Sequence, residues 1–266
     1  MAQKRITIRD VAKAAGVSVA TVSYVVNNRT DIKLTDETRK KVLQVINLLD
    51  YSPNHAAKAL AANRKSILAV CFSETASLLQ QAEQMHTLQF ISEYFHRKNC
   101  ELLVLNNRYA EKCDQADAII CYDMESKRFR QLGDSNFIPL IALDCLINDP
   151  LFFQINTDPE HLRRKAGEQF GAEPYNLIIL KSPNVEKQSF FLRAFPYLIF
   201  AETYEDLASV SGQNLLITDY TLYELLKANN HVCYVPSMSE EKAALLNQCL
   251  EAALKRTPIE QHHLLV

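Results

Sequence analysis

The sequence lacks the local motifs that mark many enzyme active sites. It contains no Gly-x-Ser-x-Gly nucleophile turn, no Walker-type phosphate loop and no His-Glu-x-x-His zinc motif. His262 and His263 follow Glu260 near the C-terminus, but adjacent side chains of an extended segment point to opposite faces. We therefore expect a solvated tail there rather than a metal site. We expect no catalytic residues, no metal and no cofactor.

Long apolar runs and paired cysteines are missing as well. No stretch approaches the roughly 18 apolar residues that a membrane-spanning helix needs. The N-terminus is polar and basic, without the apolar core of a signal peptide. The 7 cysteines are odd in number, and most lie in apolar runs such as the one around Cys121. Such cysteines are typical of buried side chains in a reducing compartment, so we expect a cytoplasmic protein without a membrane partner.

Acidic residues are scarce in the first part of the chain, although the net charge of the whole is only −2. Residues 1–65 contain 12 basic and 5 acidic side chains, a balance of +7. The remaining residues contain 17 basic and 26 acidic side chains, a balance of −9. A basic segment attracts the phosphates of nucleic acid and an acidic one is repelled by them. The split predicts a DNA-binding head and a separate body.

The basic segment carries the signals of two short helices joined by a tight turn. Thr7 is placed to cap a first helix with Asp10 as its partner, Gly16 to end that helix, and Ser18 to cap the next. The apolar spacing predicts a buried face formed by Val11, Ala15, Val22 and Val26, and an outward face formed by Val19, Ala20, Ser23 and Tyr24. This pattern predicts a helix-turn-helix, whose second helix enters the DNA major groove.

These residues resemble the head of the lac-repressor (LacI) family of bacterial transcription regulators. The resemblance continues through Thr35–Leu43, similar to the family's third helix, Tyr51–Asn54, similar to the start of its hinge, and Ala57–Leu60, similar to its hinge helix. An unrelated amphipathic three-helix unit would not account for turn, caps, third helix and hinge in this order. The resemblance implies a transcription regulator, in the first instance a repressor, that binds a palindromic double-stranded DNA operator as a homodimer.

The resemblance also implies which residues contact DNA. Val19 and Ala20 offer apolar contact to thymine methyl groups, and Tyr24 offers a hydroxyl to the bases. Leu60 is similar to the leucine that wedges open the central base step from the minor groove, the alternative being a leucine that packs within the hinge. The full implied set is Thr7, Ile8, Val19, Ala20, Thr21, Ser23, Tyr24, Asn27, Asn54, Lys58, Leu60 and Ala61.

From Ser66 onward, short apolar runs alternate with helical periodicity. We expect strands at 66–72, 101–105, 118–122, 139–143, 177–180, 197–200, 215–218 and 231–235, and helices at 77–97, 159–170, 220–229 and 239–256. This alternation predicts parallel sheets covered on both faces, an α/β fold. The expected domains are a helix-turn-helix head at 1–52, a hinge helix and linker at 53–65 and a core at 66–266. The resemblance implies that the core is periplasmic-binding-protein-like, two parallel-sheet lobes around an effector cleft, and also the surface of dimerisation.

The core departs from the family in length and in glycine content. Only 106–117 lies between the second and third expected strands, too little for a full crossover helix, and the last expected strand leads directly into the last helix. The whole chain contains 5 glycines, whereas sugar- and purine-binding members approach their ligands with glycine-rich loops. We therefore expect a reduced core, in which the sequence does not guarantee an intact effector site.

Four residues of the core resemble effector-binding positions of the family: Asp219, Asp158, Asp144 and Arg193. An aspartate between a strand and a helix is also a common N-cap, so both roles stay open.

Three hypotheses about the function remain. The first is a homodimeric repressor controlled by a small metabolite such as a sugar. The second is a regulator whose core is independent of ligand or controlled by a protein partner. The third, a solute-binding or enzymatic α/β protein, conflicts with the head.

Overall fold

The computed structural model describes residues 6–26, 34–49, 51, 65–105, 112–113, 115–257 and 260–266, with the backbone alone for Asn47. The chain divides into two compact units, Met1–Ala62 and Asn63–Val266, which we call the head and the core. The hinge helix expected within 53–65 lies outside the described residues. Among the helices that the structure describes, none is long and apolar enough to cross a membrane.

The described part of the head consists of three helices, α1 (Ile8–Ala15), α2 (Val19–Val26) and α3 (Asp36–Leu48). Their facing sides form a small apolar core of Val11, Ala12, Ala15, Val22, Val25 and Val42. The expected buried face is confirmed, with one shift: Val25 is more deeply buried than Val26, which packs at the edge of this core. In the described part of the head the inner sides of the three helices are therefore buried together, and the first turn of α2 lies outside this core.

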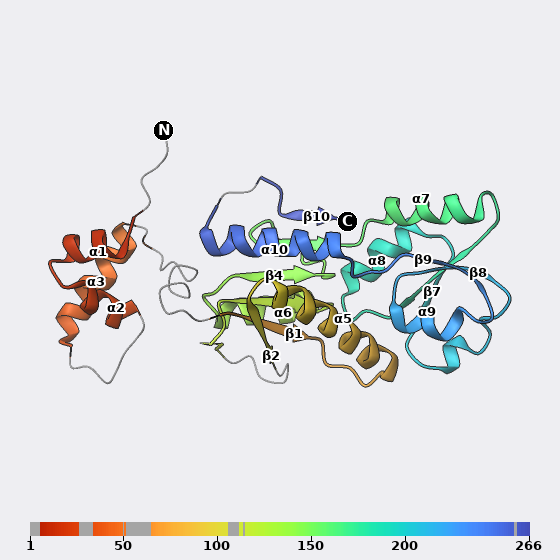
Figure 1. Cartoon of the computed structure of the whole chain (residues 1–266), viewed down its shortest axis with the longest axis horizontal. Coiled ribbons are helices and arrows are strands. Elements are labelled where there is room, and N and C mark those ends of the chain that lie inside the picture. The colour runs from red at the N-terminus through yellow and green to blue at the C-terminus, as the bar shows by residue number, and fades with distance from the viewer. Residues whose placement is uncertain are drawn as a thin grey trace. The chain divides into compact units, whose positions relative to one another are not determined.

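The first lobe of the core is built on a six-stranded sheet in the order β10-β5-β4-β3-β1-β2, with paired strands parallel. Its strands are β1 (Ser66–Phe72), β2 (Cys100–Leu105), β3 (Ala118–Tyr122), β4 (Leu140–Leu143), β5 (Phe153–Asn156) and β10 (His263–Leu265). Its helices are α5 (Leu78–Arg97), α6 (Ser126–Ser135) and α10 (Glu240–Lys255). Apolar side chains of α5 and α10 pack on one face of the sheet and those of α6 on the other, so both faces are covered. Figure 1 shows these helices beside the sheet.

The second lobe is built on a four-stranded parallel sheet in the order β7-β6-β8-β9. Its strands are β6 (Asn176–Leu180), β7 (Leu198–Ala201), β8 (Asn214–Ile217) and β9 (His231–Tyr234). Its helices are α7 (Pro159–Phe170), α8 (Val185–Ala194), α9 (Tyr220–Leu226) and the 3-10 turn η1 (Glu205–Leu207). Helices α7 and α8 cover one face and α9 the other. The chain enters this lobe after β5 and returns to the first lobe after β9.

The expected fold class is confirmed: a helical head precedes a parallel-sheet α/β core with two lobes. All eight expected strands and all four expected core helices are present, and their bounds agree with the expected ones to within three residues. Two strands, β5 and β10, and two helices, α6 and α8, were not expected.

The prediction of a solvated tail around His262 and His263 is wrong. Residues 263–265 form β10, which pairs in parallel with β5 at the sheet edge. The His262 ring lies 4.6 Å from the Phe153 ring, and its Nδ1 contacts the carbonyl of Pro150. The backbone of β5 needs hydrogen-bond partners at this edge, and the chain end supplies them. The core thus has a further strand after its last helix.

Candidate DNA interface and the junction between the lobes

Capping interactions set the start and the end of α1. The Thr7 N–H donates to Asp10 Oδ2 at 2.8 Å, and Thr7 Oγ1 accepts from the Asp10 N–H at 3.4 Å, which completes the expected capping box. Gly16 ends the helix at φ 64°, and its N–H bonds the carbonyls of Ala12 and Lys13. A left-handed residue at this position turns the chain sharply into α2, which is the geometry of a helix-turn-helix.

The next two helices begin with hydroxyl caps. The Thr21 N–H donates to Ser18 Oγ at 3.0 Å, and the Thr38 N–H donates to Thr35 Oγ1 at 3.2 Å. The cap expected at Ser18 is therefore confirmed, and Thr35 begins α3 as expected. These local bonds fix the three starting points from which the helices pack against one another.

The predicted base-reading residues lie together on α2. Val19 is 42% exposed and Ala20 is exposed, so the first turn of the helix is open for contact. Ser23 and Tyr24, one turn later, are half-buried, as are Ile8 and Thr21, while Thr7 is exposed at the start of α1. The remaining implied contacts lie outside the described residues: Asn27, Asn54, Lys58, Leu60 and Ala61.

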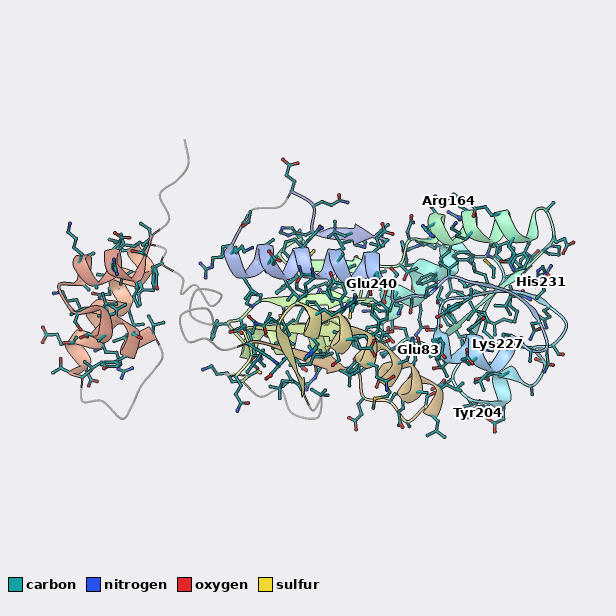
Figure 2. The ribbon with its side chains drawn as sticks, in the orientation of Figure 1. Glu83, Arg164, Tyr204, Lys227, His231 and Glu240 are labelled. Carbon is teal, nitrogen blue, oxygen red and sulfur yellow. The ribbon has the colours of Figure 1, made fainter. Side chains whose placement is uncertain are left out.

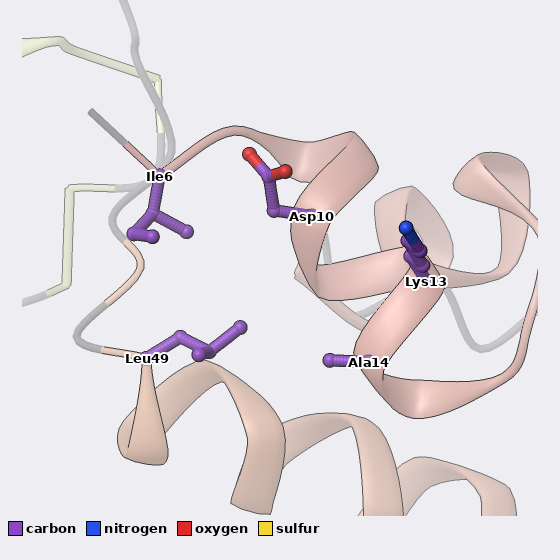
Figure 3. A pocket seen from close by; sticks show the side chains of 5 residues that line it. All are labelled: Ile6, Asp10, Lys13, Ala14 and Leu49. Atoms are coloured by element: carbon purple, nitrogen blue, oxygen red, sulfur yellow. The ribbon is translucent and has the colours of Figure 1, made fainter. Parts of the chain in front are cut away.

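A hollow of about 470 Å³ lies between α1 and the end of α3 (Figure 3). Its lining residues are Ile6, Asp10, Lys13, Ala14 and Leu49. Because α2 contributes none of these side chains, the hollow is separate from the residues predicted to read bases.

Asp158 and Asp144, two of the candidate effector residues, are bound by other groups of the core. Asp158 caps α7, its Oδ1 accepting from the Glu160 N–H at 2.9 Å. Asp144 is 3% exposed and pairs with Lys242, with 2.6 Å between Oδ1 and Nζ. Lys242 also donates to the Ser237 carbonyl and to Thr157 Oγ1. Burial lowers the pKa of Lys242, and the adjacent carboxylate of Asp144 opposes that effect.

Asp219 and Arg193 occupy different environments in the second lobe. Asp219 Oδ2 accepts from the Leu180 N–H at 3.0 Å and so ties the end of β8 to β6. Burial raises the pKa of Asp219 to about 7, and the nearby charge of Glu83 adds to the rise. Arg193 is exposed in the last turn of α8. The structure therefore brings Asp144 and Asp219 near the same two lysines, Lys187 and Lys242, and does not place Arg193 among them.

Four charged residues at the junction between the lobes were not predicted: Glu83, Asp123, Lys187 and Lys242. Glu83, which is labelled in Figure 2, lies on α5 and is 4% exposed. Its carboxylate accepts from the N–H groups of Tyr220 and Thr221 at 3.1 and 2.8 Å. Burial lowers the pKa of Lys187, but Asp123, Asp144 and the hydrogen bond to Asp123 outweigh it and leave that pKa raised. Each of these four charged groups is thus paired across or within the lobes, whereas in the described part of the chain Oδ2 of the nearby Asp144 is buried without a hydrogen-bond partner.

Residues 7–54 match the model of the family described as "Bacterial regulatory proteins, lacI family". Catabolite control protein A of Streptococcus mutans is 50% identical over 72 residues, which are 27% of this chain and 21% of that protein. The repressor PurR of Mannheimia succiniciproducens is 32% identical over 152 residues, which are 52% of this chain and 43% of that protein. A probable transcription regulator from Thermus thermophilus superposes with a TM-score of 0.49 at 12% identity, covering 75% of this chain and 93% of that one.

The chain spans only part of the curated relatives that it matches. Catabolite control protein A of Staphylococcus epidermidis is 29% identical over 185 residues, which are 65% of this chain and 55% of the relative.

Proposed function

We propose that this chain, which carries a lacI-family head at residues 7–54, is a sequence-specific transcription regulator that binds a near-palindromic operator as a homodimer. The observation that carries the proposal is the open first turn of α2, a helix whose opposite side packs in the apolar core of the head. The +7 balance of residues 1–65 adds salt-sensitive affinity for the phosphates. We place the protein in the cytoplasm and assign it no enzymatic activity.

In this proposal α2 enters the major groove. The exposed side chains of Val19 and Ala20 cannot donate or accept hydrogen bonds, so they select thymine by contact with its methyl group. The hydroxyl of Tyr24 adds a polar contact to a base edge. Thr7 and Ser23 bind phosphates, which positions the helix without specifying sequence.

The hinge completes the operator contacts in the same proposal. Two copies of residues 53–65 would pair in the minor groove, each inserting Leu60 at the central base step. Lys58 would add a phosphate contact. Because each copy reads one half-site, a dimer requires two half-sites related by two-fold symmetry.

Selection from random duplexes with the full chain tests the proposal. We expect enrichment of a near-palindrome, and footprinting should protect both halves. Ala20→Glu places a carboxylate on the reading helix and should abolish enrichment. Gln44→Glu adds the same charge to an exposed position of α3 and should preserve the selected sequence. No enrichment by the wild-type chain would contradict the proposal.

A second question is what controls the regulator. The candidate effector residues Asp144, Asp158 and Asp219 all accept hydrogen bonds from the chain itself. This observation favours a core that is independent of small molecules over one that a sugar controls. A thermal-shift screen of the full chain against sugars, sugar phosphates and nucleobases distinguishes these two kinds of control.

A metabolite that raises the melting temperature of the chain would support the alternative, a repressor that a small molecule controls. In that case Asp219→Ala should weaken its binding by about 1.5–3 kcal/mol, the value of a charge-assisted hydrogen bond. Unchanged affinity in that variant would place the ligand elsewhere.

A further inference from the structure

An ion pair connects the two lobes of the core at their junction. Lys187, on α8 of the second lobe, approaches Asp123, which follows β3 of the first lobe, with 2.8 Å between Nζ and Oδ1. The two side chains are only 18% and 17% exposed. Ser182, also from the second lobe, donates its hydroxyl to the same oxygen at 2.5 Å. One carboxylate oxygen of the first lobe therefore holds two groups of the second.

The side chain of Asn184 makes a second connection beside this pair. It is fully buried and caps α8, its Oδ1 accepting from the Lys187 N–H at 2.7 Å. Its Nδ2 donates to the carbonyls of Met124 and Leu146 at 2.8 and 3.1 Å, and both carbonyls belong to the first lobe. The residue that starts α8 is thus bound to two loops of the other sheet.

Helix α5 of the first lobe makes contacts in the opposite direction. Leu79 packs in the apolar cluster of the second lobe, and Glu83 binds the first N–H groups of α9. The rings of His86 and Tyr220 stack with centroids 4.1 Å apart. Among the described residues, the lobes are therefore joined by α8, which reaches the first lobe, and by α5, which reaches the second.

We propose that Asp123, Ser182, Asn184 and Lys187 form an internal latch, which holds the lobes together without a bound small molecule. The buried charges of Asp123 and Lys187 satisfy each other while the lobes are joined. If either Asp123 or Lys187 were removed, the remaining charge would be mostly buried without its main partner. Opening of the junction would let water solvate that charge. Removal of either partner should therefore shift the core toward an open arrangement while each sheet stays folded.

The latch has a consequence for control of the regulator, and this consequence rests on the proposed function. A ligand changes operator affinity only by binding two arrangements of the lobes unequally. Where the chain's own groups already hold one arrangement, a metabolite gains little by favouring it. Operator binding by this chain should then be constitutive, and the latch variants should be the ones that alter it.

Hydrogen exchange and small-angle scattering of the full chain test the latch directly. Lys187→Gln should increase exchange at residues 123–126 and 184–188 by roughly tenfold or more and enlarge the radius of gyration. Lys181→Gln is the matched control, because Lys181 is half-exposed and pairs with Glu202 inside the second lobe. That variant should exchange like the wild type at both segments.

A double-mutant cycle that combines Lys187→Gln with Asp123→Asn distinguishes loss of the ion pair from misfolding of a single variant. Asparagine suits the left-handed backbone of residue 123, where φ is 45°. Once one partner is gone, removing the other should change exchange much less than it does in the wild type. Equal effects in both backgrounds, or wild-type exchange and radius in Lys187→Gln, would overturn the latch.

Exchange and scattering need no DNA, so these results stand apart from the test of operator binding. A metabolite that slows exchange at the junction of the wild type would also overturn it.

Discussion

Asp219→Asn should remove a pH-dependent loss of stability from the core. Burial, aided by Glu83, raises the pKa of Asp219 to about 7, against roughly 3.9 in an unfolded chain. Since the folded state holds the proton more tightly, the contribution of Asp219 to stability is complete below about pH 4 and is lost as pH rises toward 7. A shift of about three pKa units corresponds to a ceiling of roughly 4 kcal/mol. The asparagine amide still accepts from the Leu180 N–H but cannot ionise.

Urea unfolding of the full chain at pH 5, 6, 7 and 8 measures this effect. The free energy of unfolding of the wild type should fall across the series relative to Asp219→Asn, and the variant should be the more stable protein at pH 8. Asp158→Asn is the control: asparagine is as good an N-cap, and Asp219 remains in place to give the wild-type slope. Parallel pH curves for wild type and Asp219→Asn would refute the argument from burial.

Three further substitutions test the head, the core and the hinge. Thr7→Val should destabilise the head by about 1 kcal/mol through loss of the cap on α1, measured by hydrogen exchange in α1, and unchanged exchange would contradict the capping role. Lys242→Met should cost about 3–5 kcal/mol in urea unfolding, because it leaves the Asp144 carboxylate buried without its partner; a cost below 1 kcal/mol would show that the pair is dispensable. Leu60→Ala should weaken operator binding and reduce DNA bending with the fold intact, whereas equal affinity and bend angle would make Leu60 a packing residue.

The helix-turn-helix could be predicted because its signals are local. Thr7, Gly16 and Ser18 each act on a backbone group within five residues, so spacing alone indicates the bonds that form. The buried strands of the core could be predicted for a similar reason, since continuous apolar runs such as β3 are typical of sheets covered on both faces.

Three of the four elements that were not expected are short or contain few apolar residues. Helix α6 offers only Phe129 and Leu132 as large buried side chains and contains a glycine. In strand β5 the polar residues Gln154 and Asn156 interrupt the apolar run, and β10 is only three residues long. Their positions are set by pairing with a neighbouring strand, which is information from elsewhere in the chain.

The charged junction could be predicted only in part. Glu83 interrupts the buried stripe of α5, and Lys242 does the same on α10, so a charge on an apolar face is the signal that could have indicated each of them. Lys187 carries no such signal, because its partner Asp123 is 64 residues away and lies in another lobe. Pairing of this kind depends on how the two sheets meet.

The stoichiometry and salt dependence of operator binding test the central claim most directly. A duplex selected by the full chain, and the same duplex with one half scrambled, are titrated over a series of salt concentrations. We predict two chains per intact duplex, a large loss of affinity when one half is scrambled, and a steep linear fall of log K with log salt. One chain bound equally well to both duplexes, or an affinity that salt does not change, would contradict the claim that this is a dimeric operator-binding regulator.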